Sequence, residues 1–437
     1  MAETKLICLD PPAGTRDFLP RDMRIRNWLF DIWKDVSRKN GFEEYDCSIV
    51  ENSSLYTRKG GDDIINEMFA FTLGNISLAL RPEMTPSLAR LMMKNIDTEP
   101  WPFKWFSIPQ CWRYEDIKRG RKREHYQWNA DIFGAPKIIS EIEIFMMIIT
   151  FFQRIGLTSD NVVLKISNRM ILQKVLNKMN VDDNLFERAC VIIDKMAKVT
   201  REEMSEKLRT EISLTNSQID TIYELCKICD VSQLSRFLDE TDETYLEMKQ
   251  IFELAEKLKI RQWLQFDASI VRGLSYYSAL VFEGFAKNMP NLQKSICGGG
   301  RYDNLLTKYG YKGTVPAVGF GFGDVVIIEL LRDMGKLPEC PIDTKYIVVP
   351  YDYNFIVDAI NVSQMIRAKG VCVATYTKLT KVAKAYDYAN RKGIDTVILI
   401  APNEWAQNKI VVKKLREDKN STTKQMTMLL SDFITNL

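Results

Sequence analysis

Residues 113–131 read RYEDIKRGRKREHYQWNAD, and the second half of this stretch predicts a strand with one polar face. Side chains of a strand alternate between its two faces, so every second residue from position 125 onward points the same way. The apolar face would carry Tyr126, Trp128, Ala130 and Ile132. The polar face would carry His125, Gln127, Asn129 and Asp131. Such a strand is buried on one side and presents polar groups on the other.

A basic turn precedes this strand, because five of the six residues from 118 to 123 are cationic. The segment 105–115 before the turn is predicted to be the partner strand of a hairpin, with Cys111, Arg113 and Glu115 on one face. A nucleic acid would use the cations but not the polar strand face, so a smaller ligand is expected as well. Taken by itself, the hairpin slightly favours a plainer interpretation, an exposed polar face beside a solvated basic turn.

The composition of the chain is that of a globular protein with more than one domain. Its 437 residues exceed the size of an ordinary single core, which predicts two or three domains. The formal net charge is only +3, so a general nucleic-acid coat is excluded and any contact with a polyanion must be local. With His125 as its single histidine, the chain cannot hold a di-histidine metal site or a Ser-His-Asp triad that avoids this residue.

Neither a membrane segment nor a metal centre is predicted. The most apolar run, around residues 142–152, contains Glu143 and is typical of a core helix. The first ten residues resemble neither a signal peptide nor a transit peptide, and nine scattered cysteines suit a reducing compartment, so a cytoplasmic location is expected. Cys226 and Cys229 form a C-x-x-C, but a zinc site would need two more ligands, so packing is the favoured interpretation.

The first half of the chain divides into a mixed part and a helical part. Residues 1–168 combine predicted helices, the clearest at 21–40, with strands that include a hairpin at 66–82 around Gly74 and Asn75. Residues 169–261 are almost free of glycine and carry capping-box signatures at Thr200 and Thr215, which predict an all-helical insertion.

The second half continues the mixed part and then changes character. Strand patterns return over residues 262–337, where the glycines 298–300 are expected to precede a helix at Arg301. A second glycine-rich piece at 318–324 is expected to precede another helix. After a short linker, residues 342–437 alternate strands and helices, which predicts a small α/β domain.

A strand-to-helix junction at residues 78–90, LALRPEMTPSLAR, carries groups suited to a small cationic ligand. Glu83 and Thr85 could accept hydrogen bonds from an ammonium group there. An ordinary helix start with Thr85 as its cap explains the same residues, and taken alone this is the favoured interpretation.

Two further segments leave a similar choice open. Residues 270–285, IVRGLSYYSALVFEGF, set Arg272 beside a turn glycine and place Tyr276 and Tyr277 at the start of a strand, as a ligand site or a plain hairpin would. Residues 295–306, SICGGGRYDNLL, contain a glycine triplet that permits close approach of the backbone to a ligand but also occurs in simple turns.

Taken together, these segments resemble the signature segments of class II histidyl-tRNA synthetases. The resemblance rests on RPEMTPSLAR, RYE…REHYQWNADIFG, VRGLSYYSALVFE and CGGGRYDNLL, and PPAGTRDFLP is similar to the family's N-terminal segment. It spans about residues 10–335, and RGLSYY followed by GGGRYD is specific to the histidine enzymes within class II. The α/β tail is similar to the family's anticodon-binding domain.

The resemblance implies an α+β fold, in which a class II catalytic core on an antiparallel sheet carries a helical insertion and a C-terminal α/β anticodon-binding domain. It implies a histidine–tRNA ligase that uses ATP to activate L-histidine as histidyl-adenylate and transfers it to the 3′ end of tRNA-His. ATP would bring bound Mg²⁺, and the protein would be a homodimer.

By the same resemblance, each candidate residue receives a role. Arg113 and Arg272 would be catalytic, because both would approach the α-phosphate where charge develops. Histidine would be bound by Glu83, Thr85, Gln127, Asp131, Tyr276 and Tyr277. ATP would be bound by Arg113, Glu115, Arg121 and His125, and the acceptor end of the tRNA by Lys118, Arg119, Lys122 and Arg123. No metal held by the protein alone is implied.

The chain departs from the family's pattern at four places, Val326, Asp131, Ser48 (usually proline) and Ser275 (commonly aspartate). Most class II enzymes carry an arginine against ATP where this chain has Val326, and Arg301 is a candidate to replace it. Relatives often have glutamate where Asp131 stands. Two other functions stay open, a histidine-binding paralogue without catalysis (the regulatory subunit of ATP phosphoribosyltransferase) and a non-enzymatic RNA-binding protein. The arginines at 113 and 272 and the tail argue against the paralogue.

Overall fold

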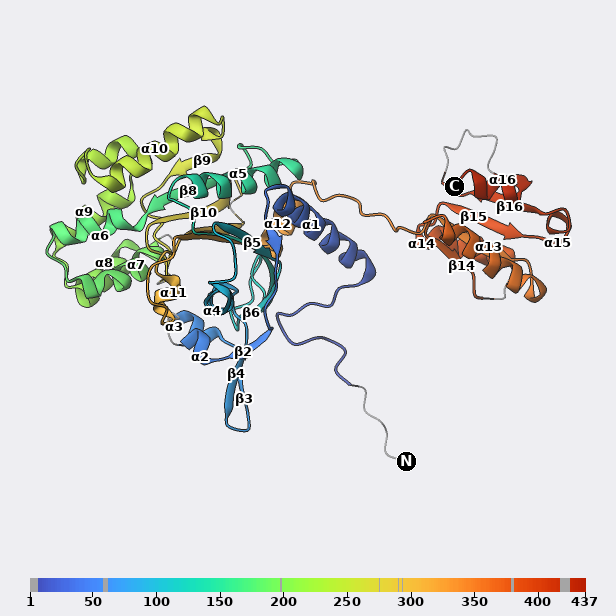
Figure 1. The fold of residues 1–437 in the computed structure, drawn as a ribbon, viewed down its shortest axis with the longest axis horizontal. Coiled ribbons are helices and arrows are strands. Elements are labelled where there is room, and N and C mark those ends of the chain that lie inside the picture. The colour runs from blue at the N-terminus through green and yellow to red at the C-terminus, as the bar shows by residue number, and fades with distance from the viewer. Residues whose placement is uncertain are drawn as a thin grey trace. The chain divides into compact units, whose positions relative to one another are not determined.

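The computed structural model forms two compact units (Figure 1), one of residues 1–19 and 26–338 and the other of residues 20–25 and 339–437. The described residues are 7–57, 62–196, 199–274, 276–289, 291–292, 294–378, 381–416 and 425–437. The first six residues, on which part of the cytoplasmic expectation rests, lie outside them. The division of the first unit into a core and an insertion stays a prediction.

A nine-stranded sheet organises the first unit. Its spatial order is β1 (Glu43–Glu44), β5 (Phe103–Ser107), β7 (Glu124–Phe133), β12 (Ala317–Gly323), β11 (Cys297–Arg301), β10 (Leu280–Ala286), β8 (Val162–Asn168) and β9 (Leu264–Phe266), with β6 (Gln110–Trp112) paired to β7 off this path. All pairs from β5 to β8 are antiparallel, and only the outermost pairs, β1 with β5 and β8 with β9, are parallel. The expected antiparallel-sheet core is confirmed.

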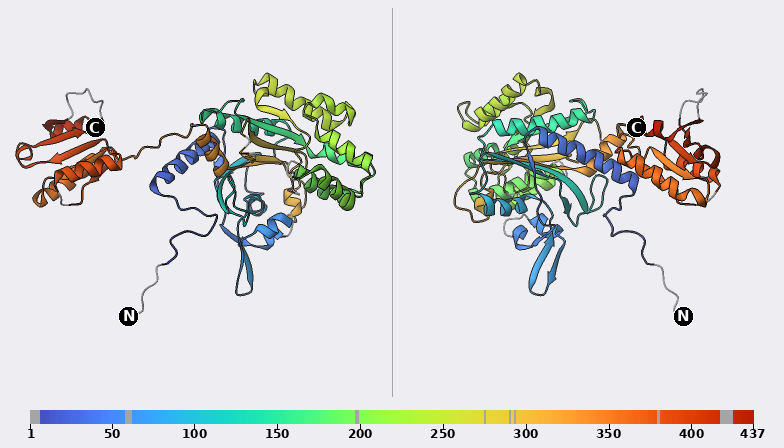
Figure 2. Two further views of the ribbon diagram at one scale, coloured as in Figure 1. Left: turned by 180° about the vertical axis from the view of Figure 1, so that it is seen from behind. Right: turned by 45° about the vertical axis from the view of Figure 1, so that its right-hand side comes forward.

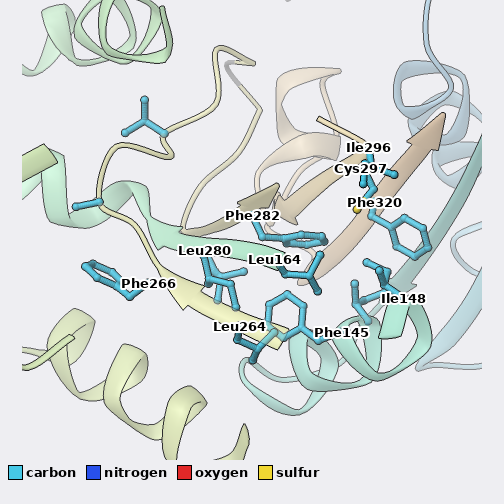
Figure 3. Packing of buried hydrophobic residues seen from close by; sticks show 14 of the residues in the cluster. Phe145, Ile148, Leu164, Leu264, Phe266, Leu280, Phe282, Ile296, Cys297 and Phe320 are labelled. Carbon is cyan, nitrogen blue, oxygen red and sulfur yellow. The ribbon is translucent and has the colours of Figure 1, made fainter. Parts of the chain in front are cut away.

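One face of this sheet is covered by two long helices, α1 (Pro20–Lys39) and α5 (Ile139–Arg154). The apolar side of β7 faces them, because Trp128 stacks on Trp33 of α1 with ring centroids 5.8 Å apart and meets Phe151 of α5 at 5.6 Å. Figure 3 shows Phe145 and Ile148 of α5 beside sheet residues such as Phe282. The opposite sheet face is therefore the one left for polar side chains.

The described part of segment 169–257 contains helices and connecting loops but no strand, as expected, and its helices gather at one end of the sheet (Figure 1). They are α6 (Arg169–Lys178), η1 (Asp183–Leu185), α7 (Phe186–Asp194), α8 (Arg201–Ile212), α9 (Asn216–Cys226), η3 (Val231–Arg236) and α10 (Glu243–Lys257). Both expected capping boxes are present, on Thr200 with Glu203 and on Thr215 with Gln218. A short helix, η4 (Arg261–Trp263), leads back into the sheet.

A smaller three-stranded sheet carries the expected hairpin. Its order is β2 (Val50–Asn52), β4 (Ile76–Leu80) and β3 (Ala70–Leu73), and the β3–β4 hairpin projects from the body of the unit in every view (Figure 2). Around it lie α2 (Ser54–Thr57), α3 (Asp62–Glu67) and α4 (Thr85–Asn95). Apolar side chains at the hairpin tip are largely exposed, with Leu73 at 62% and Ile76 at 56%.

Four local predictions were wrong. The glycines 298–300 lie within strand β11, and the next helix, α11 (Leu305–Lys308), begins only at Leu305, because residues 297–301 pair with strands on both sides. The strand predicted over 105–115 is interrupted after β5 and ends at Trp112. Tyr276 and Tyr277 lie in the loop between β9 and β10, not at a strand start. Thr85 is not a helix cap, since Met84 holds that position in α4.

Helix α12 (Asp324–Asp333) follows β12 as expected and completes the first unit. The second unit is the expected α/β domain, with a sheet of order β14 (Val373–Thr375), β13 (Tyr346–Pro350), β15 (Thr396–Ile400), β16 (Lys409–Lys414) and β17 (Gln425–Leu429). Its helices are η5 (Tyr353–Phe355), α13 (Ile356–Ala368), α14 (Val382–Lys392), α15 (Pro402–Trp405) and α16 (Leu430–Thr435). None of the helices in the described residues is long and apolar enough to cross a membrane.

Candidate active site

A cavity of about 1750 Å³ lies on the polar face of β7. His125, Gln127, Asn129 and Asp131 all line it, as the alternation of the strand predicts. The apolar side chains between them point into the core, so this strand alone positions four polar groups along one wall. The cavity exceeds the usual range for a single small ligand, roughly 300 to 1,000 Å³.

Glycines of the neighbouring strands leave room for these polar side chains. A Cβ added at Gly321 of β12 would lie 2.5 Å from Gln127 Nε2, and one added at Gly298 of β11 would lie 2.8 Å from Arg272 Nη1. Any larger residue at either position would displace the side chain above it. The glycine-rich segments therefore serve as the floor of the cavity rather than as turns.

Asp131 lines the cavity and is only 5% exposed. The hydroxyl of Tyr302 donates a hydrogen bond to Asp131 Oδ1. Burial raises the pKa of Asp131 to about 7, although the Tyr302 hydrogen bond acts in the opposite direction. The ring of Tyr277 lies 6.3 Å from that of Tyr302, measured between centroids, and lines the same space. This part of the cavity thus offers the carboxyl group of Asp131 and the phenols of Tyr277 and Tyr302 to a ligand with a polar ring.

A second carboxyl group, that of Glu83, lines the same cavity and is 6% exposed. The Tyr276 hydroxyl donates to Glu83 Oε2 at 3.1 Å, and Thr85 neighbours the same phenol. Burial raises the pKa of Glu83, and the positive charge of Arg113 offsets part of that effect. A cation bound here would meet a desolvated carboxyl group with few other partners.

Two arginines, Arg113 and Arg272, line the cavity. Arg113 is fixed by a hydrogen bond of 3.0 Å from its Nε to the Pro82 carbonyl oxygen, and Arg272 forms an ion pair with Glu283. Burial alone would lower the pKa of each guanidinium, but nearby carboxylates outweigh it, chiefly Glu83 for Arg113 and Glu283 for Arg272, so both pKa values are raised. Both arginines stay charged at any physiological pH.

Only part of the basic turn lines the cavity. Lys118 and Lys122 line it, and Arg121 pairs with Glu115 at 2.6 Å on its wall. The other two cations point elsewhere. Arg119 pairs with Asp333 and Glu329 of α12, and the Arg123 guanidinium lies over the Tyr114 ring, 3.7 Å from its centroid. Of the four cations predicted to meet a tRNA, the structure thus brings two to the cavity.

His125 is held in its neutral form. Burial lowers its pKa to about 3, and the charges of Arg113 and Arg16 add to this effect. It therefore offers a flat, uncharged ring to the cavity, beside the arginine that the hairpin also supplies.

Arg301 does not line the cavity. Its side chain is 0% exposed, and its Nε donates to Glu141 at 2.5 Å while Nη1 donates to Asp303 at 2.9 Å. The suggestion that Arg301 replaces the missing family arginine is therefore wrong, because its charge is already balanced inside the core. Val326, at the position of that arginine, does line the cavity. Lys294 also lines the cavity and lies near Val326. Both side chains contact the same point, because a Cβ added at Gly120 would be 3.5 Å from Val326 and 3.7 Å from Lys294.

Sequence reasoning missed several residues that line this cavity. Tyr302 is the clearest, and its place after the glycine triplet in GGGRYD was the available signal. Glu187 and Asp194 of α7 also line it, although nothing in the helical pattern of that segment distinguishes them. In the described part of the chain, no group of three or more histidine, cysteine or acidic side chains is arranged to hold a metal ion.

Comparisons with known proteins agree on one family. The family model described as histidyl-tRNA synthetase matches residues 14–323, and the model described as anticodon binding domain matches residues 345–437. The histidine–tRNA ligase, chloroplastic/mitochondrial, of Arabidopsis thaliana is 43% identical over 98% of this chain and 86% of its own length. The histidine–tRNA ligase of Leptospira biflexa is 33% identical over 92% of this chain and 92% of its own.

The fold agrees as well. The crystal structure of histidyl-tRNA synthetase from Nostoc sp. PCC 7120 superposes with a TM-score of 0.79 at 22% identity, covering 99% of this chain and 100% of the other. The family model matches most of the first unit, and the relatives named above span almost the whole chain. The chain therefore belongs to the histidyl-tRNA synthetase family.

Proposed function

We propose that this protein activates L-histidine with ATP to form histidyl-adenylate and transfers the histidyl group to the 3′ end of tRNA-His. One observation carries the proposal, a single cavity that is lined by two buried carboxyl groups, Glu83 and Asp131, and by two fixed arginines, Arg113 and Arg272. The carboxyl groups suit the two polar parts of histidine, and the arginines suit the phosphate on which its carboxylate acts.

In this proposal, histidine lies with its ammonium group at Glu83 and its ring at Asp131. Glu83, Thr85 and Gln127 accept hydrogen bonds from the ammonium group, and Tyr276 holds Glu83 in place. Asp131 accepts the N–H of the imidazole, and Tyr277 serves the other side of the ring. A site that pairs both ring nitrogens rejects analogues that leave buried partners unpaired, by roughly 10⁴-fold or more when the match is good.

Arg113 and Arg272 act on the α-phosphate of ATP. The carboxylate of histidine attacks phosphorus, the bond to pyrophosphate breaks, and negative charge grows on the oxygens between the two arginines. Each aimed charge stabilises that transition state by roughly 3 to 4 kcal/mol, by analogy with other oxyanion donors. No base is needed, because the histidine carboxylate is already ionised at neutral pH.

ATP is proposed to lie along the hairpin, with its adenine against His125 and its terminal phosphates at Arg121. A neutral His125 ring suits stacking, since it adds no charge beside the base. Magnesium would enter with ATP, and Glu115 is the carboxylate on that wall that could contribute one ligand, the phosphates and water supplying the rest. Magnesium would neutralise phosphate charge there.

The acceptor end of the tRNA is proposed to approach the cavity beside the basic turn, and its anticodon to be bound by the C-terminal unit. Lys118 and Lys122 line the cavity and would contact acceptor-end phosphates, whereas Arg119 and Arg123 would have to leave carboxylate and aromatic partners first. The exposed apolar tip of the β3–β4 hairpin, with Leu73 and Ile76, supports a homodimer in which a second copy covers this surface.

The alternative of a catalytically inactive regulatory paralogue is not favoured, because relatives named histidine–tRNA ligase match this chain through its C-terminal unit. A purely RNA-binding role would not require the buried carboxyl groups of Glu83 and Asp131 in the cavity. We propose a cytoplasmic location; a relative named chloroplastic/mitochondrial makes fractionation of cells that express the tagged protein the appropriate check.

The deciding experiment is exchange of radiolabelled pyrophosphate into ATP with histidine as the only amino acid. We expect exchange that depends on histidine and magnesium and occurs without tRNA, followed by charging of tRNA-His. Exchange that is absent with every amino acid would favour the inactive paralogue or the RNA-binding protein and would overturn the proposal.

A further inference from the structure

Arg169 joins the helical insertion to the loop that carries Arg272 and the two tyrosines. It is the first residue of α6 and is only 1% exposed. Its Nη1 donates to the carbonyl oxygens of Leu274 at 3.2 Å and Tyr277 at 2.5 Å, and its Nη2 donates to Glu187 Oε2 at 2.8 Å. The Arg169 guanidinium thus donates to two backbone carbonyls of the loop and to the Glu187 side chain of α7 at the same time.

The main chain of Arg169 is itself fixed. Its amide donates to the Ala279 carbonyl oxygen at 3.0 Å, and Asn168 before it accepts from the Met170 amide as the helix cap. The guanidinium therefore projects from an anchored point of the sheet onto the loop, and the planar fork of arginine matches several acceptors at once.

Helix α7 contacts the same loop at a second point. Asp194, at its other end, lies beside the loop backbone, because a Cβ added at Gly273 would be 3.5 Å from Asp194 Oδ2. Asp194 also contributes to the raised pKa of Arg272. Glu187 and Asp194 are seven residues apart, so two turns of one helix face lie along the loop.

The loop needs such support. Arg272 has a φ of 55°, in the left-handed region that non-glycine residues rarely adopt. Backbone of this kind persists only where its surroundings hold it. Arg169 is deeply buried, and its ion-pair partner Glu187 is 47% exposed. Removing such a cation from water costs free energy, so the ion pair is weak evidence that Arg169 stabilises the folded protein. It is better explained as a contact that fixes the geometry of the loop.

We infer that Arg169 is a positioning residue for the activation step, acting through Arg272, Tyr276 and Tyr277, and that helix α7 of the insertion sets the geometry of their loop. This deepens the function proposed above and rests on it. The insertion then serves the amino-acid site directly, besides any contact that it makes with tRNA.

The test compares Arg169→Met, Arg169→Lys and Glu187→Gln with wild type in histidine-dependent pyrophosphate exchange. Arg169→Met should lower kcat/KM for histidine about 100-fold, the loss that a misplacement near 1 Å brings, while the KM for ATP changes less than threefold. Arg169→Lys keeps the charge and one carbonyl bond and should recover part of the loss. Arg209→Gln, an exposed cation paired within the insertion to Glu206 and Asn216, is the control and should match wild type.

Hydrogen exchange provides a readout independent of catalysis. In Arg169→Met, the amides of residues 272–279 should exchange faster, while those of β7 stay protected. If that variant does not fold, Glu187→Gln carries the same test, because its side chain is half exposed. A folded Arg169→Met within twofold of wild type, or equal deprotection of β7, overturns the inference. Absence of histidine-dependent exchange in wild type would instead overturn the proposed function, and hydrogen exchange would still test the loop.

Discussion

Replacing Asp131 by asparagine should stabilise the folded protein and weaken its use of histidine at the same time. Asparagine has nearly the same shape and can still accept the hydrogen bond from Tyr302, but it cannot ionise. Because burial raises the pKa of Asp131 from 3.8 to about 7, the folded state resists ionisation of this carboxyl group and the unfolded state does not.

The magnitude follows from linkage between proton binding and folding. Between pH 4 and 7 the folded protein holds a proton on Asp131 that the unfolded chain has released, so stability falls as pH rises through this window. A rise in pKa from 3.8 to about 7 corresponds to about 4 kcal/mol of stability, fully lost above pH 7. The variant avoids this loss, so its advantage should be greatest near pH 8 and vanish near pH 4.

The assay is thermal unfolding of wild type and Asp131→Asn at several pH values from 4 to 8, without ligand and then with histidine. Asn129→Ala, on the same strand face but without a carboxyl group, should keep the pH dependence of wild type. Histidine should raise the unfolding temperature of wild type but not of Asp131→Asn, and kcat/KM for histidine should fall roughly 10- to 100-fold. Parallel stability curves for wild type and Asp131→Asn, or an unchanged KM for histidine, would refute the reasoning.

Three further outcomes follow from the site. Arg113→Ala should lower pyrophosphate exchange about 10²- to 10³-fold with little change in unfolding temperature, and near-normal exchange would remove the hairpin from the catalytic site. Changing Lys118 and Lys122 together to glutamine should lower tRNA charging and reduce its salt dependence, because fewer counterions are released, while exchange without tRNA stays constant. Deleting residues 342–437 should spare exchange and reduce charging, and sedimentation of the shortened protein will show whether its oligomeric state changes.

The wall of the site could be predicted from the sequence because it lies on one strand. Alternation along β7 separates Trp128 and Ile132, which pack in the core, from Gln127 and Asp131, which line the cavity. Adjacent residues and a fixed period of two suffice for that prediction. The capping boxes of the helical segment 169–257 were predictable for the same reason, since each involves groups only three residues apart.

What failed depended on contacts between distant segments. The glycine triplet at 298–300 has the composition of a turn, yet pairing with β10 and β12 makes it a strand, since tertiary partners override local propensity. Arg301 looked available for a phosphate until Glu141, 160 positions earlier in the chain, proved to be its partner. The bond from Tyr302 to Asp131 likewise spans 171 positions and has no local signal.

The electrostatics of the cavity indicate a site completed by its ligand. Asp131 and Glu83 both have raised pKa values because burial is the largest influence on each, and the described side chains do not fully compensate it. A bound ammonium group at Glu83 would favour the ionised carboxylate, since an opposite charge at short range lowers the pKa of an acid. An imidazole N–H at Asp131 would act in the same direction through hydrogen bonding. The same burial disfavours the ionised form of these carboxyl groups in the free protein. It would strengthen their interaction with histidine bound as proposed, because a hydrogen bond to a desolvated acceptor is electrostatically stronger.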